Sequence, residues 1–507
     1  MRQPVYLLMG LALMAGACKG KLIDPDLPGQ PNPPGTITPS FAVRIGNTGF
    51  DQVTDLAADP DGSVYVAGTF GGSVDFDPGT GTLFLTSLGL SDGFLAKYTA
   101  TGALVWAGRL GGISADTVTS LWRDATGNLL IGGGFEGAAD FDPGTGSQFL
   151  TSVGGTDGFL AAFSAAGGLL WARRFGGTAS DMIFDVAADA AGNAYAAGVF
   201  AGQADALPAP GGQVVSDGAA PDGFVLAFDA GGAVRWTFSI GGVQDDGAAA
   251  LTVTTDGSVV VGGIFRGLAD FGPGTSTSQL TAAGGTDAFV ASYTSAGTLR
   301  WTRALSGIAN EDVQIGGLAA DGSGGVAASG SFAGTTVFSP GAGSASRTSL
   351  GSSDWYAARF DGSGNLQTVF SVGGTGPDIA PRLSIDADGN LLATGGFRGS
   401  VDFDPGPSSQ ILTSLATSGS DAFAARYTPA GAVLWTRSFG EATAAADRLT
   451  TGTVMIPAGQ GTALLAGRFY GAPNFGSSTA PFGLLSLGSA DGFVVRLTSS
   501  GAIATSP

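Results

Sequence analysis

The chain has 507 residues, 41 acidic and 22 basic side chains, and a formal net charge of −19. Such an acidic surface repels the phosphates of nucleic acid, so we expect no nucleic-acid partner. Histidine is absent, which excludes His-based triads, His–metal sites and imidazole acid–base catalysis.

Residues 1–17 have the composition of an export signal. Arg2 precedes a short apolar run that ends in Ala15-Gly16-Ala17, and Cys18 follows as the single cysteine. The run is too short to span a membrane and fits a secretory signal. The Ala15–Cys18 stretch resembles a bacterial lipoprotein lipobox, which implies lipidation of Cys18, although Ala15 stands where that motif usually has Leu. Ordinary signal peptidase also accepts this stretch, so plain secretion is the alternative.

A proline-rich segment follows the signal. Residues 18–39 contain six prolines and few apolar side chains, a composition that cannot bury a core and indicates an extended tether. We therefore expect residues 40–507 to form the folded domain, and the lipid anchor to place it at the outer membrane or cell surface. A soluble secreted or periplasmic protein is the alternative.

From residue 41 onward the sequence repeats with a period of about 65 residues, marked by an aromatic residue that opens a strand-like stretch. The first full unit predicts four strands at residues 54–59, 64–70, 93–99 and 103–110, punctuated by Gly and Asp-x-x-Gly turns. Seven aromatic residues mark the repeats: Phe41, Trp106, Trp171, Trp236, Trp301, Phe370 and Trp435.

Seven four-stranded units with apolar faces on both sides predict an all-β, seven-bladed β-propeller. The stretch "DGFLAKYTATGALVWAGRLGG" (92–112), with the "D-x-A-A-D-x-x-G-N" turn pattern, resembles the bacterial β-propeller repeat family SBBP, which is related to NHL-type repeats. The resemblance covers residues 41–507 and implies the propeller fold. It implies no particular activity, because that family has no shared biochemistry.

The incomplete repeat units at the two ends of the chain together contain the strands of one blade. The last unit, at 491–507, has a third strand but no aromatic residue to open a fourth, whereas residues 41–46 form a fourth strand without the preceding three. We expect residues 41–46 to complete the last blade and close the ring. In the alternative, residues 502–506 form that strand and residues 41–46 only cover it.

The longer connections, between the second and third strands and between blades, share one face of a propeller, where function is usually found. Within them "V-D-F-D-P-G" repeats, which suggests either a calcium site built from paired carboxylates or a Phe anchor between solvated acids and a turn. The carboxylates concerned are Asp75, Asp77, Asp140, Asp142, Asp402 and Asp404. An Asp that recurs in every blade is expected to accept N–H groups of its own loops.

Residues that break the repeat are the candidates for ligand binding. In the fifth unit these are Glu311, Trp355 and Tyr356, and in the second unit Trp122 and Arg123 lie in the innermost strand. Aromatic side chains beside carboxylates suit sugar stacking or protein binding, although a degenerate repeat produces the same pattern by altered packing.

Two main functions compete. The sequence favours a non-catalytic envelope lipoprotein, a monomeric binding or scaffold module whose long-loop face meets a protein or glycan partner, with calcium as the one candidate cofactor. The alternative is a polysaccharide hydrolase or lyase with carboxylates as acid and base, for which Glu136, Glu311 and Glu441 lie in long-loop segments. A calcium-stabilised surface or matrix component is the third possibility. The sequence contains no recognisable catalytic motif.

Overall fold

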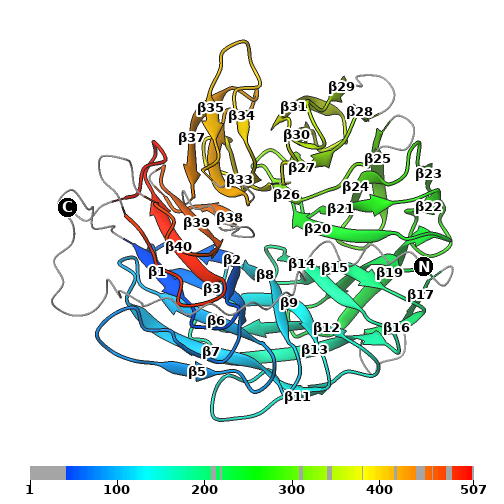
Figure 1. Cartoon of the computed structure of the whole chain (residues 1–507). Helices are drawn as coiled ribbons and strands as arrows, with labels where there is room; N and C mark the ends of the chain where they lie inside the picture. Colours follow the sequence, from blue (N-terminus) through cyan, green and yellow to red (C-terminus); the bar gives the residue numbers. More distant parts are fainter. Residues whose placement is uncertain are drawn as a thin grey trace.

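Seven β-sheets are arranged around a central axis in the computed structural model of the chain (Figure 1). The structure describes residues 41–206, 213–216, 220–307, 312–339, 345–379, 381–415, 419–440, 451–459, 461–475 and 482–504. Within these ranges every regular element is a strand, and no helix is long and apolar enough to cross a membrane. The seven-bladed propeller expected from the repeat is confirmed.

Each blade is a four-stranded antiparallel sheet whose strands, from the axis outward, are called a to d. Strands a line the axis: β2 (Gln52–Ala58), β8 (Thr117–Arg123), β14 (Met182–Ala188), β20 (Gly247–Val253), β26 (Gly317–Ala320), β32 (Arg382–Ile385) and β38 (Thr451–Pro457). Strands b follow: β3 (Val64–Phe70), β9 (Leu129–Phe135), β15 (Ala194–Phe200), β21 (Val259–Phe265), β27 (Val326–Phe332), β33 (Leu391–Phe397) and β39 (Ala463–Phe469).

The outer two strands of each blade carry the repeat's most recognisable residues. Strands c begin at an Asp: β6 (Asp92–Tyr98), β12 (Asp157–Phe163), β18 (Asp222–Phe228), β24 (Asp287–Tyr293), β30 (Asp354–Phe360), β36 (Asp421–Tyr427) and β40 (Asp491–Leu497). Strands d are β7 (Leu104–Gly112), β13 (Leu169–Gly177), β19 (Val234–Gly242), β25 (Leu299–Gly307), β31 (Leu366–Gly374), β37 (Val433–Phe439) and β1 (Ala42–Ile45).

In the second to sixth blades the long b–c segment contains a hairpin that joins the sheet of the preceding blade, and in the first blade the corresponding hairpin forms a two-stranded sheet of its own. For example, β10 pairs with β7 through Ala139↔Gly112, and a Cβ on Gly112 would lie 2.0 Å from the Ala138 carbonyl oxygen. This close approach explains the Gly-Gly that ends strand d. The hairpins are β4 (Ser73–Asp75)–β5 (Phe84–Thr86), β10 (Ala138–Asp140)–β11 (Phe149–Thr151), β16 (Gln203–Ala206)–β17 (Gln213–Val215), β22 (Leu268–Asp270)–β23 (Gln279–Thr281), β28 (Thr335–Phe338)–β29 (Ala345–Thr348) and β34 (Ser400–Asp402)–β35 (Ile411–Thr413).

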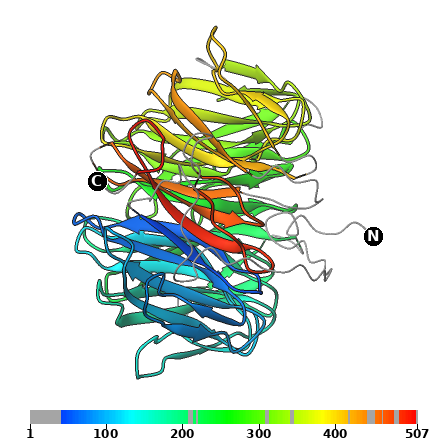
Figure 2. The same cartoon turned by 60° about the vertical axis from the view of Figure 1, so that its left-hand side comes forward.

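The ring is closed by the N-terminal strand, as predicted. β1 pairs antiparallel with β40 from Ala42↔Val495 to Ile45↔Gly492, and Figures 1 and 2 show these two strands, blue and red, side by side. The C-terminal residues that were the alternative for this fourth strand also contribute to it, because Leu497 forms a bridge with Ile503. Strand d of the last blade is therefore composite, with residues 503–504 followed by Phe41 and β1.

The aromatic residue that opens each strand d joins its blade to the next one. Trp171 lies over Gly232, in the c–d turn of the following blade, and its Nε1–H donates to the Ala230 carbonyl at 3.0 Å. Phe41 approaches Gly102 in the same way, so it fills the seventh aromatic position. Seven clusters of buried apolar side chains lie between neighbouring blades and form the core of the ring.

Candidate functional site

The long-loop face is held together by aspartates of the loops that lead from strand d to the next strand a. Asp181 accepts the N–H groups of Gly177 at 2.7 Å and Ala201 at 3.1 Å, and Asp116 does the same with Gly112 and Glu136 at 2.6 and 3.3 Å. Burial raises the pKa of both carboxyls to about 6, although these N–H donors oppose the shift. These aspartates have the structural role expected from their recurrence.

The Asp that opens each strand c has a similar role. Asp157 accepts the Val153 N–H at 3.1 Å and a hydrogen bond from Arg174 at 2.6 Å, and its side chain is fully buried. Burial raises its pKa, opposed by these two donors. Such residues order the loop before strand c and leave little of the carboxylate for a ligand.

The carboxylates of the b–c hairpins bond to their own turns. Asp75 accepts the N–H groups of Asp77 and Leu83 through one oxygen, and Asp77 accepts that of Gly79. The corresponding acids Asp140, Asp142, Asp402 and Asp404 repeat these bonds. In the part of the chain that the structure describes, no three His, Cys, Asp or Glu side chains are grouped as for a metal ion. Calcium binding stays a prediction.

The two aromatic candidates of the fifth blade lie in the core instead of on the loops. Trp355 is fully buried and stacks on Phe423 with ring centroids 5.8 Å apart, and the buried Tyr356 donates its hydroxyl to the Gln314 carbonyl at 3.0 Å. A strand c is covered on both faces, so neither ring is placed to stack on a ligand, which corrects our expectation for them. Glu311 lies outside the described residues.

The long-loop face exposes a group of large apolar side chains. Leu88, Leu90 and Ile113 have 59%, 86% and 79% of their surface accessible. They lie in two adjacent loops, because Ser91 bridges to Ala115 and a Cβ on Gly89 would touch the main chain of Ile113. We call these three the apolar loop patch. Equivalent loops of other blades expose Val153, Val243, Leu350, Ile379 and Leu415.

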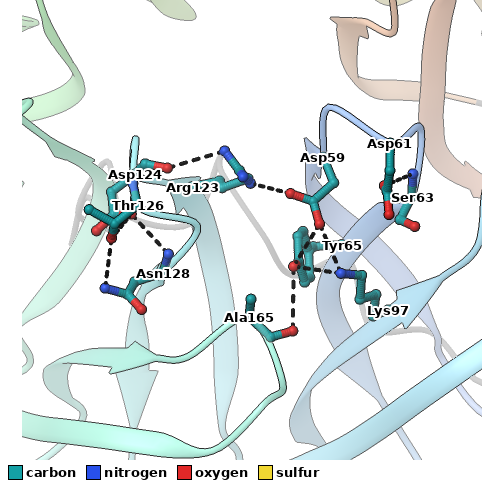
Figure 3. Close-up of polar contacts among 10 residues, drawn as sticks. All are labelled: Asp59, Asp61, Ser63, Tyr65, Lys97, Arg123, Asp124, Thr126, Asn128 and Ala165. Carbon is teal, nitrogen blue, oxygen red and sulfur yellow. Dashed lines mark hydrogen bonds and ion pairs between the residues drawn. The ribbon is translucent and has the colours of Figure 1, made fainter.

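On the opposite face, the tight a–b turns are braced by ion pairs (Figure 3). Arg123 reaches from β8 to Asp59 of the first blade at 2.7 Å, and Asp59 also accepts hydrogen bonds from Lys97 and Tyr65. These bonds hold the pKa of Asp59 below its ordinary value against the opposing effect of burial. Arg123 is therefore engaged between two blades, and its side chain is only partly exposed.

At the axis the strands a enclose a cavity of about 410 Å³, to which all seven blades contribute. Trp122 lines it together with Val253, Ile385 and Ile456. The cavity extends to Thr255 and Gly322 in a–b turns, so it lies toward the tight-turn face. Of the candidates predicted from the sequence, Trp122 is the one that lines this cavity.

Four polar side chains, which we call the collar, project from the walls of this cavity: Asp55, Ser120, Asp185 and Arg382. The Ser120 hydroxyl lies 2.8 Å from Asp185 Oδ1 and 3.3 Å from Asp55 Oδ2, and Arg382 Nη1 lies 3.8 Å from Asp55 Oδ2. Burial raises the pKa of Asp55 to about 6, opposed by Arg382 and reinforced by Asp185.

The collar occupies one position of the repeat, and sequence reasoning missed it. In every blade this position pairs with the fourth residue of strand b, and the seven occupants are Asp55, Ser120, Asp185, Ala250, Gly317, Arg382 and Val454. The next residue along the chain is an apolar Leu, Val or Met in all seven blades. A position that is acidic in some repeats and basic in another, directly before a constant apolar residue, was the signal that the sequence offered.

No protein-family model matches the chain. Among curated proteins, Regulatory protein FlaEY of Caulobacter vibrioides is 28% identical over 269 residues, which cover 51% of this chain and 27% of that protein. An uncharacterized WD repeat-containing protein of Acanthamoeba polyphaga mimivirus is 23% identical over 32% of this chain and 13% of its own length. The chain thus spans under a third of either relative.

The matches to solved structures have low identity and low TM-scores. Sqt1 from Chaetomium thermophilum has a TM-score of 0.39 and 11% identity, covering 85% of this chain and 97% of Sqt1. A protein of unknown function from Bacteroides caccae has a TM-score of 0.31 and 11% identity over 68% of this chain and 89% of its own. These likenesses concern the fold and carry no information on a ligand.

Proposed function

We propose that the protein is a non-catalytic cell-envelope lipoprotein whose propeller is a binding or scaffold module, with the long-loop face turned to a protein partner. The observation that carries this proposal is the apolar loop patch. Large apolar side chains grouped on an exposed surface mark interaction sites in otherwise soluble domains. The ring beneath them is braced by buried aspartates, so the patch is presented in one fixed arrangement and loses little conformational entropy on binding.

A protein fits this surface better than a glycan. Sugars are usually held by aromatic faces flanked by hydrogen-bonding groups, whereas Leu88, Leu90 and Ile113 are aliphatic. Two acids near the patch bond within their own loops: Asp92 accepts the Leu88 N–H and an Arg109 hydrogen bond, and Asp116 accepts the Gly112 N–H. An aliphatic surface of this kind matches the apolar centre of a protein–protein interface.

Replacing the apolar loop patch by serine is expected to abolish partner capture. In the triple variant Leu88→Ser, Leu90→Ser and Ile113→Ser, loss of the buried apolar contact area should reduce binding at least ~10-fold. The measurement is chemical cross-linking in intact cells, followed by quantitative mass spectrometry of the proteins recovered with the chain.

The matched control changes three apolar residues on the outer strands d that are about half exposed: Val105→Ser, Leu170→Ser and Leu434→Ser. This variant should recover the same partner in the same amount as the unchanged chain. Equal losses in both variants would show a general surface effect and overturn the assignment to the long-loop face. Recovery of cell-wall glycan with the patch variant intact would favour the glycan alternative.

Anchorage is proposed to depend on Cys18, which lies outside the described residues. Stable membrane attachment requires two acyl chains or their equivalent, so Cys18→Ser should move the protein from the membrane fraction to the soluble fraction of exported proteins. Cell fractionation with immunoblotting measures this shift. An N-terminal peptide of the unchanged protein that carries an unmodified Cys18 would contradict lipidation and favour plain secretion.

The polysaccharide-acting enzyme remains the second hypothesis. Among its candidate acids, Glu136 is exposed next to a hairpin, whereas Glu311 and Glu441 lie outside the described residues. The two collar carboxylates both contact the Ser120 hydroxyl, and both are engaged with main-chain N–H groups, which supports a binding role over acid–base work. The resemblance to SBBP repeats likewise stays a prediction.

A further inference from the structure

We propose that the axial cavity is a second binding site, for a small organic cation that combines an ammonium group with an apolar body. The collar would hold the ammonium group, and the aliphatic and indole walls of the cavity would hold the apolar body. This site lies toward the tight-turn face, and it does not depend on the function proposed for the long-loop face.

The cavity has the size and lining of a small-molecule site. Its volume of about 410 Å³ falls within the usual range of ligand pockets, which are mostly apolar with a few convergent polar groups. Here the walls include Trp122, Val253, Ile385 and Ile456, and the collar supplies two carboxylates and a guanidinium. Small or absent side chains at the collar position of the fourth and fifth blades leave space opposite the acids.

The collar side chains also have a structural role, because they join neighbouring strands a. Asp55 accepts the Leu121 N–H of the next blade at 2.9 Å, and Asp185 accepts the Leu251 N–H at 2.8 Å. Ser120 makes the equivalent contact to the Val186 N–H at 3.3 Å without a charge. A hydroxyl thus suffices for this bond.

The charges of the two carboxylates are therefore not required for the hydrogen bonds between neighbouring strands a. Placing two like charges on either side of one hydroxyl in a partly buried wall is unfavourable unless a cation is near. Arg382 provides one positive charge at 3.8 Å from Asp55, and two carboxylates against one guanidinium leave the ionised collar with a net charge of −1. A ligand ammonium between Asp55 and Asp185 would neutralise that charge and donate hydrogen bonds to both.

The pair of probes that tests this site is benzylamine and benzyl alcohol, which have nearly the same shape and differ in charge. At pH 8, titration of the purified domain monitored by ligand-observed NMR should give benzylamine a dissociation constant at least ~10-fold lower than that of benzyl alcohol. Asp185→Asn and Asp55→Asn should each weaken benzylamine binding at least ~5-fold. Arg382→Gln should strengthen it, because the competing guanidinium is removed.

Two further variants separate the site from general effects. Ala320→Leu adds bulk at the half-exposed cavity wall without changing charge and should also weaken benzylamine, with an unchanged melting temperature. Asp61→Asn removes an exposed acid in an a–b turn and should leave binding as it is. Equal affinity for the two probes, or benzylamine binding that survives both the collar changes and Ala320→Leu, would overturn the proposal.

Discussion

A chain that begins at residue 48 is expected to unfold at a much lower urea concentration than a chain that begins at residue 40. The shorter chain lacks β1, so strand c of the last blade loses the partner that pairs from Ala42 to Ile45. It also lacks Phe41, Val43 and Ile45, which are fully buried between the last and first blades. Removal of a single large buried aromatic costs ~3–5 kcal/mol, so we expect a loss of at least ~4 kcal/mol.

Phe41→Ala in the longer chain separates the contribution of side-chain packing from that of the β1–β40 hydrogen bonds. This variant keeps the β1–β40 hydrogen bonds and loses the contacts with Gly102 and with the guanidinium of Arg496, which lies 5.7 Å from the ring centre. It should therefore fall between the two chains in urea-unfolding experiments followed by circular dichroism. If the chains that begin at residues 40 and 48 have the same transition midpoint, β1 does not close the ring in solution.

The second large effect concerns pH. Burial raises the pKa of Asp51, Asp116 and Asp181 to about 6 and that of Asp246 and Asp378 to about 7, although main-chain N–H donors oppose the shift. A group with a raised pKa binds its proton more tightly in the folded state. Its contribution to the stability of the fold is therefore complete below its pKa in the unfolded chain, near 4, and is lost as the pH rises through 6–7. The protein should therefore be more stable at pH 5 than at pH 8.

A carboxyl group whose pKa is about one unit higher in the folded than in the unfolded state contributes ~1.4 kcal/mol to this pH dependence. These five carboxyls are buried and their shifts add, so we expect the free energy of unfolding to change by at least ~3 kcal/mol between pH 5 and pH 8. Urea midpoints at pH 5, 6, 7 and 8 measure the slope. Asp116→Asn combined with Asp181→Asn should flatten it, whereas the exposed Asp61→Asn should leave it unchanged. Stability that is constant or rises with pH would show that the N–H donors outweigh burial at these sites.

The repeat period and its apolar runs predicted the fold closely. The second strand of the first blade was expected at 64–70 and is β3 (Val64–Phe70), and the fourth, expected at 103–110, is β7 (Leu104–Gly112). Ring closure by residues 41–46 is also confirmed. These predictions succeeded because strand patterns and turn residues are local, and because seven copies average out local exceptions.

The remaining features depend on contacts between repeats, which local patterns do not contain. The hairpin acids looked like ligands until the turn N–H groups that they bind were visible, as for Asp75 and Leu83. Trp355 broke the repeat but did so in a buried position, where its ring replaces smaller side chains of other blades. The sequence did not reveal the collar, because Asp55 and Arg382 lie 327 residues apart in the chain and come close only in the folded ring.

The attachment of five b–c hairpins to the sheet of the preceding blade has a consequence for the history of the protein. A sheet such as β2-β3-β6-β7-β10-β11 is drawn from two consecutive repeats, so one repeat cut out of the gene would encode a sheet that lacks its outer hairpin and a hairpin that lacks its sheet. A propeller with one blade more or fewer would therefore need the duplication or deletion of a whole repeat of about 65 residues, so that each such hairpin keeps a preceding sheet to join.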